Sequence, residues 1–139
     1  MSAKVLPLRE RAPETEKITI NLGYVDLGRI DLLVQEGFFS NRTDFIRTAI
    51  RNQLRQQSEE VLRSVERHRM EVGLLELGAA ELEAARAAGE TLHVKVLGLI
   101  RIARDVTPEL ALQTIGSLTV LGALQASREI KAALAPRIK

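Results

Sequence analysis

The segment that most constrains how this chain can fold is residues 16–22, EKITINL, in which apolar and polar side chains alternate. The apolar positions are Ile18, Ile20 and Leu22, and the polar positions are Lys17, Thr19 and Asn21. This period of two predicts a β-strand with one buried face, and no similar stretch occurs before residue 70. A lone strand leaves the backbone N–H and C=O groups of both edges unpaired, which is costly beside a buried apolar face. The strand therefore needs another strand to pair with.

Two amphipathic helices are predicted after this strand. In the first, apolar residues recur every three or four positions from Leu27 to Val34, and Gly37 marks its end. The second follows FFSNR, with Asn41 or Ser40 as its N-cap and Asp44 in a pattern that resembles a capping box. Its apolar stripe consists of Phe45, Ile46, Ala49, Ile50 and Leu54. Because neither proline nor glycine interrupts the next residues, we expect this helix to run to about residue 70 as a connector.

The partner that we expect for the strand is its own copy in a second subunit. Two antiparallel strands related by a two-fold axis would pair their inner edges and bury their apolar faces in a shared core of four helices. The alternative is that the strand forms one edge of an intramolecular sheet with C-terminal strands. In the dimer, the outer face displays Lys17, Thr19 and Asn21 twice, on a ribbon that fits the major groove of B-DNA. Free backbone N–H groups near the start of the second helix can hold a phosphate.

Residues 16–56 resemble the ribbon-helix-helix DNA-binding domain, the class of the Arc, MetJ and CopG-type repressors. The residues that carry the resemblance are KITINL, Gly37, SNRTDFIRTAIR and the spacing between them, over about a third of the chain. In that family the outward strand residues contact bases, and the N-terminus of the second helix contacts phosphate. The resemblance implies base contacts for Lys17, Thr19 and Asn21, and phosphate contacts for Asn41, Arg42 and Thr43. The chain departs from the pattern in its early basic strand residue and in a long C-terminal region that the pattern does not explain.

Beyond residue 70 the sequence repeats itself. GLIRIARDVTPELA from Gly98 aligns with GALQASREIKAALA from Gly122 at an offset of 24, and a fainter copy, GLLELGAAELEAA, begins at Gly73. Each copy predicts a strand, a polar turn and a helical piece, and Thr107 before Pro108 is the clearest helix start. Such repeats predict strands stacked side by side in a small solenoid-like unit. We interpret the repeated glycines as bends or sites of tight packing.

We therefore predict an α+β chain. Its expected parts are a flexible arm (1–15), the ribbon-helix-helix domain (16–56), a helical connector (57–70) and a C-terminal repeat domain (71–139). Zero cysteines remove disulfides, thiolate metal sites and cysteine nucleophiles, and they fit a cytoplasmic location. We expect no membrane span and no secretory segment. A net charge of +2 is too small to indicate a polyanionic partner by itself, so DNA binding depends on where the basic groups lie.

The sequence predicts no enzyme, because no nucleophile, base and orienting group cluster together, and no metal or cofactor, because His68 and His93 stand alone. The interpretation is a homodimeric DNA-binding transcriptional regulator, a repressor that binds operator double-stranded DNA. Its C-terminal region would serve assembly, effector sensing or partner binding. Two alternatives remain: an antitoxin whose C-terminal region binds a toxin, and an assembly protein that polymerises through its repeats. Arg47, Arg51 and Arg55, spaced by four, are interpreted as a solvated helix face.

Overall fold

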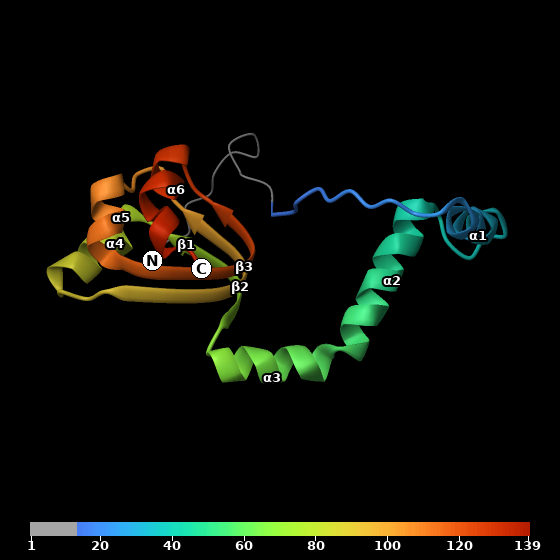
Figure 1. The fold of residues 1–139 in the computed structure, drawn as a ribbon, viewed down its shortest axis with the longest axis horizontal. Helices are drawn as coiled ribbons and strands as arrows, with labels where there is room; N and C mark the ends of the chain where they lie inside the picture. The colour runs from blue at the N-terminus through green and yellow to red at the C-terminus, as the bar shows by residue number, and fades with distance from the viewer. Residues whose placement is uncertain (1–13) are drawn as a thin grey trace. The chain divides into compact units, whose positions relative to one another are not determined.

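The computed structural model describes residues 14–139, and this part of the chain divides into two compact units (Figure 1). The N-terminal unit, Lys17–Arg67, contains helices only, and the C-terminal unit, which includes His68–Lys139, contains the sheet. The helices of the N-terminal unit are α1 (Tyr24–Gln35), α2 (Arg42–Gln56) and α3 (Ser58–His68). The chain thus combines helices and strands, as the sequence predicted. The arm expected over residues 1–15 lies outside the described residues except for its last two.

Helix α1 ends at the glycine that the sequence indicated. Gly37 has a φ of 87°, in the left-handed region that glycine enters without a steric penalty. Its N–H donates to the carbonyl oxygen of Val34 at 3.1 Å, and the N–H of Phe38 donates to that of Leu33 at 3.0 Å. These two bonds form a Schellman motif, which satisfies carbonyl groups of the last helical turn. The predicted glycine stop is confirmed.

Helices α2 and α3 are separate, whereas the sequence led us to expect one helix to about residue 70. Gln57 lies between them with φ −98° and ψ 9°, and its N–H is shared by the carbonyl oxygens of Gln53 and Leu54. The residues that follow explain the break without proline or glycine. Ser58 is a residue type that favours helix starts, and Glu59 and Glu60 place negative charge in the first turn of α3.

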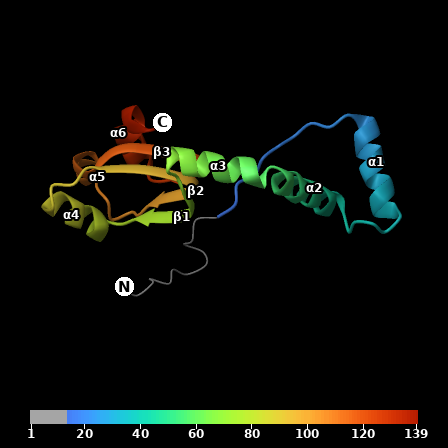
Figure 2. The same cartoon turned by 90° about the horizontal axis from the view of Figure 1, so that it is seen from below.

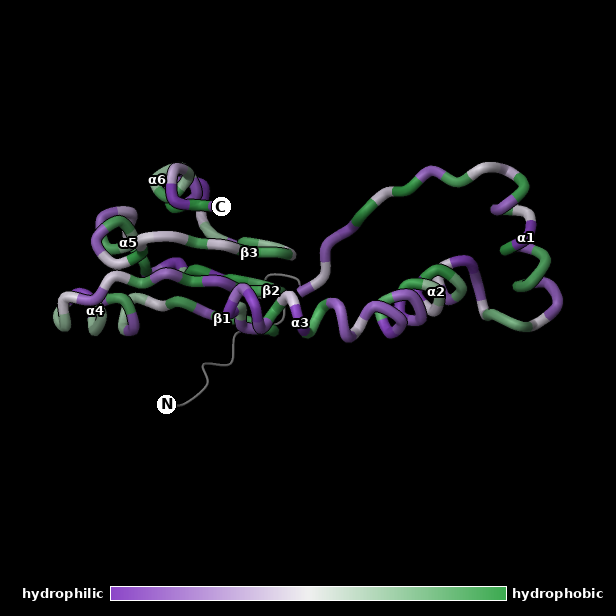
Figure 3. Tube along the Cα trace, turned by 60° about the horizontal axis from the view of Figure 1, so that its bottom comes forward, coloured by the Kyte–Doolittle hydropathy of each residue, from purple (hydrophilic) through white to green (hydrophobic). Residues whose placement is uncertain are grey.

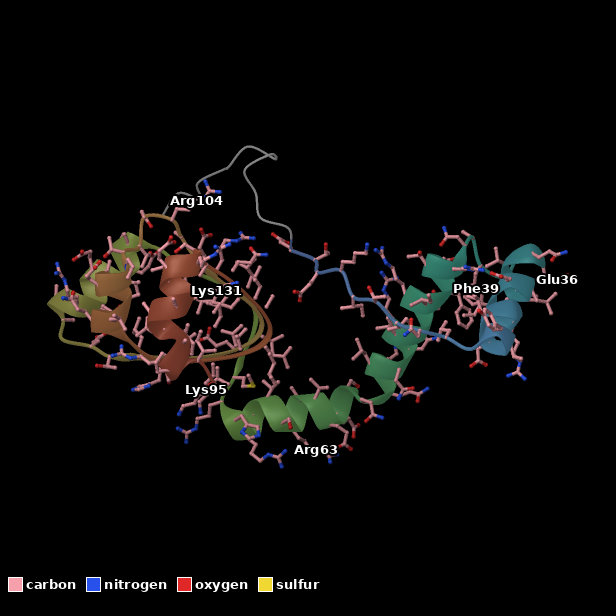
Figure 4. The ribbon with its side chains drawn as sticks, turned by 45° about the horizontal axis from the view of Figure 1, so that its top comes forward. Glu36, Phe39, Arg63, Lys95, Arg104 and Lys131 are labelled. Atoms are coloured by element: carbon pink, nitrogen blue, oxygen red, sulfur yellow. The ribbon has the colours of Figure 1, made fainter. Side chains whose placement is uncertain are left out.

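The N-terminal unit has almost no core of its own. Ile30 is its single buried residue, and Phe39 packs edge-on against Phe45 with ring centroids 5.0 Å apart, between α1 and α2 (Figure 4). Residues 16–22 are assigned no strand in the single chain, so the expected ribbon is not confirmed. Their three apolar side chains are largely exposed: Ile18 by 74%, Ile20 by 56% and Leu22 by 41%. Many further apolar side chains of this unit are exposed, including Tyr24, Val25, Leu32, Phe38, Ile50, Leu54 and Leu62.

In the C-terminal unit, strands and helices alternate along the chain. The elements are β1 (Glu71–Leu77), α4 (Ala79–Ala87), β2 (Leu92–Ile102), α5 (Pro108–Thr114), β3 (Ile115–Gln125), α6 (Arg128–Leu134) and the 3-10 helix η2 (Ala135–Arg137). The sheet is parallel throughout, in the order β1-β2-β3. Within residues 14–139 no segment from the N-terminal unit joins it, which speaks against the intramolecular alternative for residues 16–22.

One face of this sheet holds the core. Helices α4, α5 and α6 lie side by side on it (Figure 2). Helices α4 and α5 are the crossovers between the parallel strands, and α6 follows β3 and packs against α5. Helix α5 starts as predicted: Thr107 Oγ1 accepts a 3.1 Å hydrogen bond from the N–H of Leu110, and Pro108 follows the cap. The completely buried apolar side chains of the core are Leu82, Ile100, Ala111, Ile115, Leu118 and Leu134.

Three glycines form a row across the sheet. Gly73 pairs with Gly98, and Gly98 pairs with Gly122, so the glycines that the sequence repeats lie in register. All three have a positive φ, of 131°, 140° and 125°. A Cβ atom on Gly98 would lie 2.1 Å from the carbonyl oxygen of Gly73, and one on Gly122 would lie 2.0 Å from that of Gly98. Each carbonyl therefore occupies the place that a side chain on the next strand would need.

The other face of the sheet carries an apolar band between polar rows, and within the described C-terminal unit no helix covers it. Two rows of side chains run across the strands there, each in register: Val72, Leu97 and Leu121 form one, and Leu74, Leu99 and Ala123 form the other. Val72 is 67% exposed and Leu121 58% exposed. Figure 3 shows long hydrophobic stretches along these strands, whereas α2 and α3 are largely hydrophilic. Among the described residues, no helix has the length and apolar character to cross a membrane.

Candidate nucleic-acid interface

The start of helix α2 is a capped terminus with two free donors. The side-chain oxygen of Asn41 accepts a 2.8 Å hydrogen bond from the N–H of Asp44, so Asn41 is the N-cap. The carboxylate of Asp44 accepts a 2.9 Å bond from the N–H of Ser40 in return. The N–H groups of Arg42 and Thr43 donate to no acceptor within residues 14–139, as expected in a first helical turn. Two backbone donors therefore point out of the helix where its dipole is positive.

A polar hollow adjoins this terminus. Its lining consists of Ser40, Asn41, Thr43, Asp44, Arg47 and Arg51. Arg47 and Arg51 follow Thr43 at one and two helical turns, so they lie on the same side of α2. Both are exposed, and neither forms an ion pair with another residue of the described chain. The sequence interpretation treated them as a solvated face. The four-residue spacing of Thr43, Arg47 and Arg51 was the pattern that could have linked them to the helix start.

Arg42 is held from the opposite side, by helix α1. Its Nε donates to Oδ1 of Asp31 at 2.7 Å, and its Nη2 donates to Oδ2 at 2.8 Å, in a bidentate pair. These hydrogen bonds hold the pKa of the Asp31 carboxyl below its ordinary value and raise the pKa of the Arg42 guanidinium. Helical periodicity does not predict this contact, because Arg42 follows Asp31 by eleven positions and a turn lies between the two helices.

The predicted base-contacting residues lie ahead of α1. Lys17, Thr19 and Asn21 are all exposed, and none forms a hydrogen bond or ion pair with a described residue. Within the single chain, no hydrogen bond joins them to the α2 terminus. Two separate groups of polar side chains thus remain open to a ligand in this unit.

The N-terminal unit follows a pattern that known regulators share. The pattern consists of an extended amphipathic segment, a short helix with a glycine stop and a capped second helix. The family model of the ribbon-helix-helix transcriptional regulators matches residues 13–131. The chain belongs to the ribbon-helix-helix transcriptional regulator family. The family match reaches through α3 and most of the sheet unit, so the C-terminal region, which we had considered outside the family pattern, is part of it. No curated protein and no solved structure matches the chain.

The chain offers no obvious metal centre in the part that the structure describes. No group of three or more His, Asp or Glu side chains there is arranged to hold a metal ion. Of the two histidines that the sequence left as structural or exposed, His93 has its Nδ1 2.9 Å from Oγ of Ser117, on the neighbouring strand.

Proposed function

We propose that this ribbon-helix-helix regulator is a homodimeric, sequence-specific repressor that occludes operator DNA by inserting a shared β-ribbon into the major groove. The observation that carries the proposal is the N-terminal unit itself, which buries only Ile30 and exposes the apolar face of residues 16–22. A unit of this size needs a larger apolar core to be stable. A second copy can supply that core.

Pairing two copies through residues 16–22 would bury six apolar side chains at the two-fold seam. Full burial of one Ile or Leu side chain stabilises by roughly 1.5–3 kcal/mol, so this contribution is large beside the free energy of unfolding of a small domain. It also closes the inner edges of both strands. Dimerisation and folding of this unit would therefore be one process.

The same pairing would bring Lys17, Thr19 and Asn21 of both chains onto one outer surface. Their side chains fit base edges in the major groove: Lys donates to guanine, Asn pairs bidentately with adenine, and Thr offers a hydroxyl and a methyl group. The free N–H groups at Arg42 and Thr43, beside the Asn41 cap, would hold a backbone phosphate and fix the register of the ribbon. Arg47 and Arg51, unpaired beside them, add positive charge to the same contact.

The experiment begins with selection of bound duplexes from a random pool at a stated salt concentration. Asn21→Ala and Lys17→Ala are then compared with wild type on the selected and on a scrambled duplex. Asn21→Ala should cost about 1–3 kcal/mol on the selected duplex and relax the preference at one base pair of each half-site. Asn52→Ala, an exposed asparagine within α2, is the matched control. Site preference that is unchanged in both folded ribbon variants would contradict base reading by the ribbon.

A second role, assembly through the C-terminal unit, is favoured by the open apolar face of the sheet. Parallel sheets are normally covered on both faces, and the helices described in the C-terminal unit cover only one. We propose a second copy of this chain as the cover. Three strands about 4.8 Å apart and two rows about 7 Å apart span roughly 200 Å² per copy, below the roughly 600 Å² per partner of small stable interfaces. The contact would therefore depend on tethering by the N-terminal dimer.

Cysteine chemistry can test this contact cleanly, because the chain has no cysteine. Leu121→Cys, an exposed position of the open face on β3, should cross-link two chains on oxidation, at a rate that does not depend on protein concentration. Ala80→Cys, on the exposed side of α4, is the control and should cross-link only slowly. Equal rates of cross-linking at both positions would contradict the proposed contact between two copies of the sheet. The DNA-binding proposal does not depend on this result.

A further inference from the structure

The bidentate pair with Asp31 neutralises the guanidinium of Arg42, which lies at the edge of the proposed phosphate contact. Asp31 lies in the second half of α1, and Arg42 is the first residue of α2. Both donor–acceptor distances, 2.7 and 2.8 Å, are those of strong charge-assisted bonds. Two parallel bonds fix the guanidinium plane as well as its position. Arg42 therefore reaches back toward α1.

The neighbouring cations are placed differently. Arg47 and Arg51 line the polar hollow and pair with no described residue, whereas Arg42 does not line it. The charged side chains near the free donors are thus two unpaired arginines, one arginine paired with Asp31, and the carboxylate of Asp44, which accepts from the N–H of Ser40. The Asp31 carboxylate neutralises the side chain of Arg42, the residue whose backbone N–H is one of the two free donors.

We propose that Asp31 is a positioning residue that acts through Arg42 as an electrostatic brake on sequence-independent DNA binding. This inference rests on the proposed DNA-binding function and adds a determinant of its specificity. Affinity for DNA of any sequence depends mainly on how many phosphates the protein neutralises. An arginine that is already bound by a carboxylate contributes little to that number, while base contacts by the ribbon are unaffected. The pair therefore favours selected sites over other DNA.

The pair weakens the contact of Arg42 with DNA without preventing it, because both side chains remain accessible to solvent. The side chain of Arg42 is 54% exposed and that of Asp31 is 49% exposed. A phosphate can therefore compete with the carboxylate for the guanidinium, and exposed ion pairs of this kind are weak in net free energy. Removing the carboxylate should release Arg42 to DNA without removing any apolar contact of the unit.

The test uses Asp31→Asn, which keeps the shape of the side chain and removes its charge. Binding to a scrambled duplex should become several-fold tighter, and the slope of log affinity against log salt should steepen by about 0.9 for one added phosphate contact. The ratio of affinities for the selected and the scrambled duplex should fall. Asp31→Glu, which restores a carboxylate, should return the slope toward that of wild type.

Two controls separate the brake from a general change of charge or structure. Asp26→Asn removes the same charge from the same helix, where Asp26 lies 3.7 Å from Arg29, and it should leave the slope unchanged. The double variant Asp31→Asn with Arg42→Gln should lose the gain, because no arginine is left to release. Circular dichroism on each variant shows whether the helices are intact.

Three outcomes would overturn the inference: an unchanged salt slope in folded Asp31→Asn, weaker binding by that variant, or a gain that persists in the double variant. Weaker binding would show that the pair only holds the helix start in place. Wild-type protein that binds neither duplex would contradict the proposed function itself, and the brake with it. The two failures are thus distinguishable by the wild-type isotherm alone.

Discussion

Asp31 shows how a single surface carboxylate ties two helices together. Hydrogen bonds from Arg42 lower its pKa in the folded chain relative to its ordinary value of 3.8. The pair therefore stabilises the fold fully above that value, and the contribution is lost as the pH falls through the lowered, folded-state pKa. The effect at neutral pH is small because both side chains are about half exposed.

We accordingly expect a pH-dependent difference in thermal midpoint between wild type and Asp31→Asn. The difference should be present at neutral pH, shrink as the pH falls below the ordinary carboxyl pKa of 3.8, and vanish in stronger acid. Thermal melts followed by circular dichroism over a pH series provide the measurement. A difference that stays constant from neutral pH into strong acid would mean that the carboxylate charge is not what stabilises the wild type.

The glycine row predicts unequal effects for the same substitution at different positions. Gly98→Ala places a Cβ 2.1 Å from the carbonyl oxygen of Gly73, and a backbone atom cannot move aside as a side chain can. Gly73→Ala meets nothing within 4 Å and has only its φ of 131° against it. We expect Gly98→Ala to lower the free energy of unfolding by more than about 4 kcal/mol, and Gly73→Ala by about 1–3 kcal/mol. Denaturant titrations of the two variants would measure both, and equal losses would contradict the packing explanation.

At the scale of elements, residues 16–22 carry the clearest expectation. Ile20→Asp should disrupt the N-terminal unit, because the charge would be buried at the proposed two-fold seam without a partner. Thr19→Asp, one residue away on the other face, should keep the fold and lose DNA binding through repulsion of the phosphates. Helical circular dichroism separates the two, since the C-terminal unit keeps its own signal. If Ile20→Asp retained the helices of the N-terminal unit, the shared ribbon would be wrong.

Local sequence chemistry predicted elements better than it predicted their limits. The Gly37 stop, the Asn41 cap and the Thr107 start are each determined by one or two residues, and the structure contains all three. The break at Gln57 was missed because no strong helix breaker marks it; a serine and two acidic residues were enough. The Asp31–Arg42 pair was missed because it depends on how two helices pack, which periodicity does not encode.

At the scale of the whole molecule, the two units should differ in how their stability depends on concentration. The C-terminal unit has a continuous core, whereas the N-terminal unit buries one residue within Lys17–Arg67. A fragment of residues 68–139 should therefore melt at a temperature independent of its concentration. A fragment of residues 1–67 should melt higher as its concentration rises, because folding and dimerisation are coupled. Light scattering gives the mass of each, and a stable monomer of residues 1–67 would contradict the dimer.

The family of the chain could be read from residues 16–56, but the role of its C-terminal half could not. The repeated glycines predicted strand-then-helix units, and the structure has three strands, each followed by a helix, with the glycines in register. The solenoid-like arrangement of these units within the chain, and the alternative that they stack between molecules, both remain predictions. The reason is physical. An exposed apolar sheet face indicates that another surface covers it, but the sequence does not indicate which molecule carries that surface.

The glycine row also affects the outer edge of β3, the edge that faces away from β2. Along the row, each glycine carbonyl fills the space of the next strand's Cβ, and Gly122 is the last member. A further strand in the same parallel register would therefore need a glycine opposite Gly122. Ile138 already bridges to Leu118 on that edge. Exposed strand edges are where sheets pair with other chains and aggregate. At this edge, steric clash with the Gly122 carbonyl would exclude any strand in the same register that lacks a glycine opposite Gly122.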